Sequence, residues 1–254
     1  MQTLRLAAAL GLISATAACG ASTGVDGGGR IALNVATNPT TASSSVGASL
    51  RNGSETYVVG TDTLVIQKVE LVLKEIELEL AVPVAGCTAG GSDNDDCEEL
   101  ELNARLFDLP LGTASGAQRT IAIDVPAGSY KEVEFEIHKP SSSSSAAFLA
   151  QNPAFNDVSI RVTGTWNSQA FTYLSDLEVD YEIEFNPPLV VGASNTTDFT
   201  VNIDVGTWFR TGTGTLIDPR TANRNQPNKS RVESNITESI KAFGDDDRDG
   251  YDDD

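Results

Sequence analysis

Strict alternation of apolar and polar residues runs through most of the chain and constrains the fold more than any other feature. In residues 177–185, LEVDYEIEF, every second side chain is apolar and the side chains between them are acidic. A period of two places the apolar side chains on one face of a β-strand and the acidic ones on the other. The same pattern recurs in residues 31–35, 120–125, 132–138, 157–163 and 198–205.

Turn-forming sequences separate these segments, such as PAG at 126–128 and NPP at 186–188. Strands that are apolar on one face and joined by such turns are typical of antiparallel sheets. We therefore expect an all-β fold over residues 29–209, in which antiparallel sheets pack as an immunoglobulin-like or carbohydrate-binding-like sandwich. The serine-rich segment 139–156 is expected to be a flexible excursion from it.

Residues 64–82 fit two kinds of element. Their β-branched content and the strands expected around them favour a strand, but helical spacing also fits Val69, Val72 and Ile76. The alternation changes phase in the middle of the segment, so a strand requires a bulge near Lys74 and Glu75. A strand with this bulge is our prediction.

The first residues have the layout of an export signal. Arg5 precedes an apolar run from Leu6 to Ile13, and small residues follow as far as residue 18. The run is too short to span a membrane, which takes about 20 apolar residues. This layout predicts a signal peptide at 1–18, and the small residues of 19–28 predict a flexible tether.

The segment Thr16-Ala17-Ala18-Cys19 resembles the lipobox of bacterial lipoproteins, in which leucine usually takes the place of Thr16. The resemblance implies cleavage before Cys19 and acyl chains on its thiol, so that a membrane is the first partner. Because Gly20 rather than aspartate follows, it also implies an extracytoplasmic location, at the outer membrane. The alternative is an ordinary secretory signal with a chance cysteine.

Two further cysteines, Cys87 and Cys97, flank a loop rich in glycine and aspartate. If Cys19 carries lipid, these two thiols remain to pair in an oxidising compartment, and we predict a disulfide between them. The alternative is a zinc site, which lacks a second pair of ligands.

The composition limits the possible functions. The net charge of −19 excludes nucleic acid as a partner, because no cluster of Lys and Arg exists to neutralise phosphates. The single histidine, His138, excludes a site with two histidines and is expected at a strand end or on the surface. The sequence has no motif for a nucleophile elbow, a phosphate loop or a zinc protease, so we expect a protein that is not an enzyme.

Acidic residues occupy the polar face of several predicted strands, in rows at 75–79, 132–136 and 178–184. Like charges destabilise a sheet when they lie directly opposite one another, so neighbouring rows would need cations or solvent to relieve the repulsion. The rows have two interpretations: a solvated outer face, or a surface for a divalent ion or a basic partner. Paired carboxylates also leave a glycan hydrolase open as an alternative.

The C-terminal part is predicted to be a loop at 210–229 and then a short helix with an acidic tail at 230–254. Ser230 and Glu233 fit a capping box, and Gly244 fits a left-handed C-cap. Between them, apolar residues recur at helical spacing and form one stripe. They are Val232, Ile236, Ile240 and Phe243.

The tail resembles the first part of an EF-hand, dockerin or thrombospondin type-3 calcium loop, with the pattern D-x-D-x-D-G. The resemblance implies that oxygens of Asp245, Asp247, Asp249, Tyr251 and Asp253 bind calcium. The sequence stops before the glutamate of position 12, so we expect weak binding, with a dissociation constant of about 10⁻⁴–10⁻³ M. The alternative is an acidic tail without a ligand.

The stretches GGRIALNV, VELVLKEIEL and VPAGSYKEVEFEI together resemble a family of bacterial exported lipoproteins whose domain has no assigned function. The resemblance implies a sandwich and supplies no catalytic residues. We therefore expect a lipid-anchored module of the cell envelope that binds a glycan, a polypeptide or a cation. The alternative is a structural envelope lipoprotein without a specific ligand.

Overall fold

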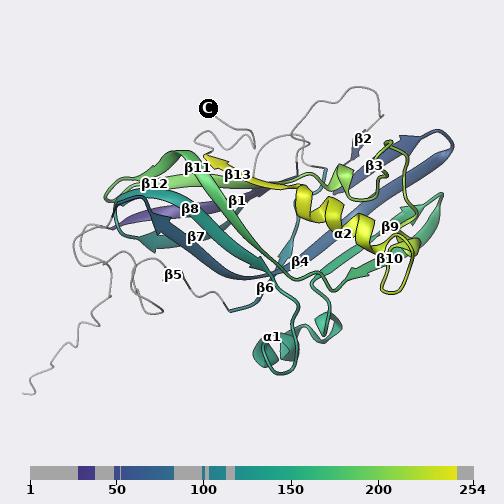
Figure 1. Ribbon diagram of the computed structural model, residues 1–254, viewed down its shortest axis with the longest axis horizontal. Helices are drawn as coiled ribbons and strands as arrows, with labels where there is room; N and C mark the ends of the chain where they lie inside the picture. The colour runs from purple at the N-terminus through teal and green to yellow at the C-terminus, as the bar shows by residue number, and fades with distance from the viewer. Residues whose placement is uncertain are drawn as a thin grey trace, which may run out of the picture.

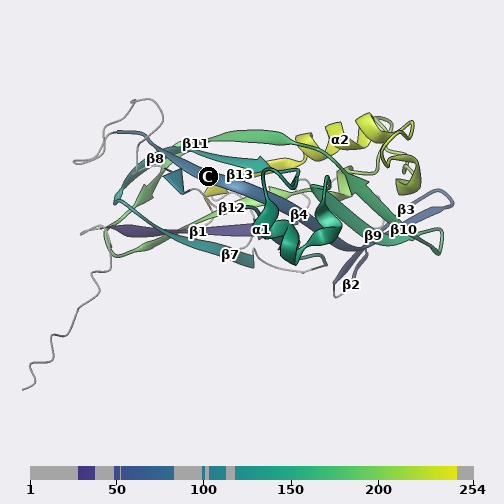
Figure 2. The same ribbon diagram turned by 90° about the horizontal axis from the view of Figure 1, so that it is seen from below.

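The protein folds into two β-sheets that pack against each other. The computed structural model describes residues 28–37, 49–51, 53–82, 99–100, 103–112 and 118–244. Most of the elements in these ranges are strands, as the alternation predicts. Figure 2 shows β8 and β11 in one layer and β1 and β7 in the layer below them.

The first sheet has the order β13-β12-β1-β7. Its strands are β1 (Gly29–Ala36), β7 (Gln118–Val125), β12 (Thr196–Ile203) and β13 (Ile240–Gly244). β1 is antiparallel to β7 but parallel to β12. The prediction of purely antiparallel sheets is therefore wrong, because local alternation defines which face of a strand is buried but not the direction of its neighbour.

The second sheet is built around the long strand β4 (Asp62–Leu80). One edge of β4 bonds to β9 and then to β8, and the other bonds to β3, β6 and β5. β10 pairs with β9, β11 pairs with β8, and β2 pairs with β3. The bounds are β2 (Ser49–Arg51), β3 (Ser54–Val59), β5 (Glu99–Leu100), β6 (Arg105–Asp108), β8 (Gly128–Ile137), β9 (Ile160–Trp166), β10 (Gln169–Ser175) and β11 (Val179–Val191).

The strand predicted over residues 64–82 is confirmed, together with its bulge. The pairing of β4 with β8 changes register between Lys74 and Ile76, and Glu75 adopts a φ of 50°. An extra residue in one strand lets the next side chains return to the same face. Leu73 before the bulge and Ile76 after it therefore both lie in the core.

The core lies between the two sheets, and the predicted inward faces are confirmed. Phe185 of β11 meets Phe199 of β12 edge to face, with ring centroids 5.7 Å apart, so the two sheets interlock directly. Buried residues of the first sheet include Ile31, Leu33, Val35, Ile121, Ile123, Val201 and Ile203. Those of the second include Leu71, Leu73, Ile76, Leu78, Val133, Phe135, Ile137 and Tyr181.

The segment 139–156 is folded, so the prediction of a flexible excursion is wrong. It contains α1 (Ala146–Gln151) and a 3₁₀ turn, η1 (Pro153–Phe155), which project from the body of the protein in Figure 1. Phe148 and Phe155 pack on Val72, on the outer side of β4, and form a small second core. These two aromatic residues supply the apolar area that holds the segment in place.

The C-terminal helix is shorter than predicted. α2 (Lys229–Glu238) buries Val232 and Ile236 as expected, but its N-cap is Asn228, and the capping box is not formed. The residues from Ile240 to Gly244 form β13 against β12, with Ile240 opposite Ile203. Pairing with β12 gives these residues backbone hydrogen bonds within the sheet and leaves Ile240 buried. Gly244 therefore ends a strand rather than capping the helix.

Candidate functional site

The three acidic rows lie side by side on one face of the second sheet, because β8 lies between β4 and β11 (Figure 1). The cross-strand sets are Glu79, Glu132 and Glu184, and Glu77, Glu134 and Glu182. We call these carboxylates, together with Glu75, Glu136, Glu178 and Asp180, the acidic face. Their side chains point away from the core, since they alternate with its buried residues.

Lysines relieve part of this charge. Lys131 Nζ lies 2.6 Å from Glu79, and Lys74 Nζ lies 3.6 Å from Glu136 and also contacts Glu75. On β11, Asp180 and its acidic successors at alternate positions are exposed to solvent. The face therefore carries a concentrated negative field that nearby lysines reduce at its margins.

Glu134 occupies the centre of the acidic face. Burial, the hydrogen bond with Glu132 and the negative charges of the neighbouring rows raise the pKa of Glu134 to about 7. Like charges close together disfavour ionisation, because each added charge repels those already present. Ionisation of this central carboxylate at neutral pH therefore destabilises the folded protein. A bound cation would reduce the repulsion.

The raised pKa gives a pH-dependent stability that Glu134→Gln should remove. Below the ordinary pKa of 4.5 the folded and unfolded chains both hold the proton, and Glu134 does not lower the free energy of unfolding. As pH rises from 4.5 to about 7 the unfolded chain ionises first, so the wild type loses stability. After allowance for solvent screening, Glu134→Gln should stabilise the protein by about 1–2 kcal/mol at pH 8.

Urea denaturation of both proteins at pH 4 and at pH 8 measures this difference. The gain should disappear at pH 4, where the wild type also carries a neutral side chain. Glu238→Gln, on the exposed side of α2, is the control and should leave the free energy of unfolding unchanged at both pH values. An equal gain for Glu134→Gln at both pH values would show that charge repulsion is not its cause.

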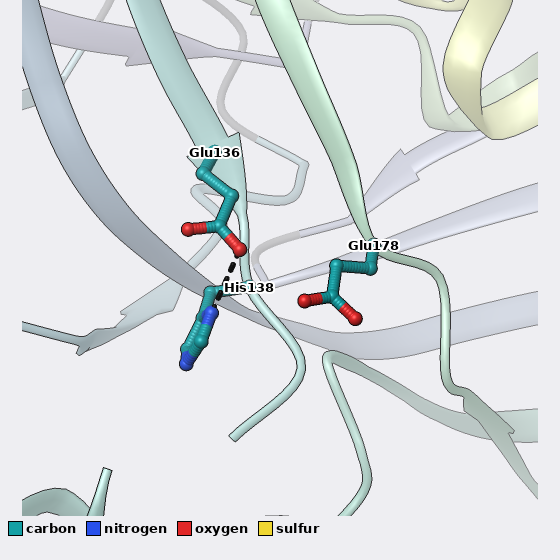
Figure 3. Close-up of side chains that lie close together, drawn as sticks. All are labelled: Glu136, His138 and Glu178. Carbon is teal, nitrogen blue, oxygen red and sulfur yellow. Dashed lines mark hydrogen bonds and ion pairs between the residues drawn. The ribbon is translucent and has the colours of Figure 1, made fainter. Parts of the chain in front are cut away.

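At the end of β8, two members of the acidic face meet the histidine. Glu136 Oε1 lies 2.8 Å from His138 Nδ1, and the Glu178 carboxylate faces this pair from the start of the neighbouring strand β11 (Figure 3). Ligand atoms of the three side chains all lie within 4.8 Å of one another. His138 follows the strand, as predicted, but it is only 4% exposed, so the surface location is wrong.

The folded segment around α1 explains this burial. Ser145, directly before α1, places its hydroxyl oxygen 2.8 Å from His138 Nε2 and does not use it to cap the helix. Both ring nitrogens of His138 therefore have polar partners. The sequence pattern could suggest Glu136 and His138, which share one strand face, but the contributions of Ser145 and Glu178 depend on long-range packing.

The order Ser145, His138, Glu136 has the hydrogen-bond connectivity of a serine hydrolase triad. A nucleophile also needs space for a substrate carbonyl beside its oxygen. Ser145 is only 7% exposed and lies between the sheet and α1. The connectivity is therefore explained by the packing of α1 rather than by acyl transfer.

Buried carboxylates also occur away from the acidic face. Glu55 on β3 accepts a hydrogen bond from the Tyr57 hydroxyl, and Asp204 accepts one from Gly206 N–H at 3.0 Å. Burial raises the pKa of Glu55 and that of Asp204. Because both carboxylates bind groups of the protein itself, their burial is explained without a glycan substrate.

The site residues predicted from motifs lie outside the described ranges. They are Cys19, Cys87, Cys97, Asp245, Asp247, Asp249, Tyr251 and Asp253. Lipidation, the disulfide and the calcium loop therefore stay predictions. Among the described residues, no helix has the length and apolar character needed to cross a membrane.

Fold and site together define a mainly β protein of two packed sheets that carries an acidic outer face. Comparison of the chain with protein-family models, with curated proteins and with solved structures finds no match. The resemblance to exported lipoproteins therefore rests on the motifs alone.

Proposed function

We propose that the protein is a lipid-anchored binding module of the bacterial cell envelope that binds calcium through its acidic face. The observation that carries the proposal is the register of β4, β8 and β11, which brings three rows of carboxylates together on one exposed surface. Calcium takes six to eight oxygen ligands, most often from carboxylates.

Solubility alone is a poor explanation for this arrangement. Acidic and basic residues mixed over a surface keep a protein soluble without placing like charges on adjacent strands. Burial of Glu134 and the carboxylates around it raise its pKa, so keeping it ionised costs folding free energy. A divalent ion would convert this repulsion into attraction, so the cost supports a binding role.

The motifs at both ends of the chain support the same proposal. The lipobox at Cys19 would place the domain outside the cytoplasm, where calcium reaches millimolar concentration, and the tether at 19–28 would separate it from the lipid. The tail from Asp245 would add a second weak calcium ligand set. Within this proposal the two sheets are a variant of the immunoglobulin-like or carbohydrate-binding-like sandwich.

Thermal unfolding with and without millimolar calcium tests the proposal. Binding to the folded state alone raises the melting temperature, and we expect a rise of a few degrees for weak sites. The double variant Glu77→Gln/Glu182→Gln removes a carboxylate from each row beside Glu134 and should lose most of this rise. The control Asp157→Asn/Glu238→Gln removes the same charge elsewhere and should retain it.

Two outcomes would contradict the proposal. If calcium has no effect on the wild type, the alternative of a structural envelope lipoprotein is favoured. If the effect is unchanged in the double variant, calcium binds elsewhere, and the Asp245 tail is the first candidate.

A further inference from the structure

We propose that Glu136, His138 and Glu178 bind one divalent transition-metal ion of the zinc type, at the end of the acidic face where a histidine joins the carboxylates. Calcium prefers oxygen ligands, whereas an imidazole nitrogen favours zinc, copper, nickel or iron. His138 supplies the nitrogen, and the two carboxylates supply oxygen and negative charge. A single histidine with two carboxylates leaves a fourth position for water.

The sheet itself brings these ligands together. Glu136 and His138 are two residues apart and so project on the same side of β8 and its extension. Val179 pairs with Ile137, and continuing this antiparallel register by one residue places Glu178 opposite His138. A same-face pair and its cross-strand neighbour form a compact triangle of side chains.

The distances suit an ion at the centre of the triangle. Zinc binds nitrogen and carboxylate oxygen at about 2.0–2.2 Å, so its ligand atoms lie roughly 3–4 Å apart. The three ligand atoms lie within 4.8 Å of one another, and Glu136 Oε1 is 2.8 Å from His138 Nδ1. Binding therefore requires the 2.8 Å hydrogen bond to open as the glutamate side chains rotate toward the ion.

The contacts around His138 match those of a metal ligand. A ligating histidine almost always gives its other ring N–H to an oxygen acceptor, which fixes the ring and its tautomer. Ser145 Oγ lies 2.8 Å from His138 Nε2 and leaves Nδ1 directed at the carboxylates. Burial of the ring beneath α1 prevents it from turning away, so the nitrogen ligand is held in place before any ion arrives.

A lysine lies beside each of the two carboxylates. Lys139 Nζ is 3.1 Å from Glu178 Oε2, and Lys74 Nζ is 3.6 Å from Glu136 Oε2. Oε1 of Glu136 is the atom that faces His138. The lysines balance part of the charge of the two carboxylates, and an ion has to compete with Lys139 for Glu178. Removing Lys139 should therefore strengthen metal binding.

Calorimetric titration of the purified full-length protein with Zn²⁺, and absorption spectroscopy with Co²⁺, test the proposal. We expect one site with nitrogen and oxygen ligands in the wild type. His138→Gln and Glu178→Gln should each weaken zinc binding at least tenfold, and Ser145→Ala should weaken it about 10–100-fold. Lys139→Gln should tighten it. Glu182→Gln, a matched charge change on the same strand, should leave it unchanged.

Glu178 is half exposed, with 49% of its side chain accessible, so Glu178→Gln tests the site even if His138→Gln fails to fold. The proposal is overturned if the wild type binds no zinc, or if Glu178→Gln binds it as tightly as Glu182→Gln does. A cobalt–thiolate absorption band would also overturn it, because it would place the ion on Cys87 and Cys97. Loss of the calcium effect in Glu77→Gln/Glu182→Gln with zinc binding retained would show that zinc binding does not need the central carboxylates of the acidic face.

Discussion

Trp208→Ala is expected to lower the free energy of unfolding by about 3–5 kcal/mol, the usual cost of removing a large buried aromatic side chain. Trp208 follows the 3₁₀ turn η2 (Val205–Thr207) and is fully buried. Its indole Nε1–H donates to Ser239 Oγ at 2.8 Å, between α2 and β13. The substitution therefore opens a cavity and leaves the buried Ser239 hydroxyl without this donor.

Urea unfolding followed by circular dichroism measures the loss. Trp208→Phe is the matched control, because it keeps most of the apolar volume but removes the indole N–H. We expect it to cost less than Trp208→Ala, with the remaining loss reporting the hydrogen bond to Ser239. A loss below about 1 kcal/mol for Trp208→Ala would show that the C-terminal segment contributes little to the folded core.

Cys19→Ser is expected to release the protein completely from the membrane. The lipobox resemblance assigns the acyl chains to this thiol, and serine cannot accept diacylglycerol in its place. Each buried methylene contributes about 0.8 kcal/mol to membrane binding, so two or three acyl chains hold a protein firmly at the membrane. Without acyl chains the protein has no lipid anchor. The predicted effect is therefore a change of compartment rather than a graded change of affinity.

Partition between detergent and aqueous phases measures this change, and mass spectrometry of the native protein locates the lipid. The wild type should enter the detergent phase with an acylated Cys19 as its first residue. Cys87→Ser also removes a thiol, but outside the lipobox, and should partition like the wild type. A native chain that retains residues 1–18, or that stays in the aqueous phase, would contradict the predicted anchor.

The sequence predicts local features of this fold well. Alternation in residues 132–138 and 177–185 identified the buried and exposed faces correctly, because a period of two depends only on neighbouring residues. The bulge at Glu75 was also visible, as a change of phase. The strand order cannot be predicted in this way, because the pairing of β1 with β12 depends on contacts between distant segments.

The same limit applies to the candidate site. Each acidic row could be recognised alone, but their adjacency depends on β8 pairing with both β4 and β11. The sequence places the end of the last helix too late, because Ile240 continues the apolar spacing of α2 but pairs with Ile203 of β12 in the fold. The sequence does not predict the burial of His138 for a similar reason: Ser145 and α1 cover it because Phe148 and Phe155 pack on Val72.

The parallel pairing of β1 with β12 has a consequence for the order in which the chain can fold. Asn34 on β1 bonds to the carbonyl of Phe199, 165 residues further along the chain. Contacts between such distant residues form slowly, because a long loop has to close first. β1 can pair with β7 earlier, but its parallel neighbour β12 becomes available only when almost all of the domain is present, so the first sheet is completed late in folding.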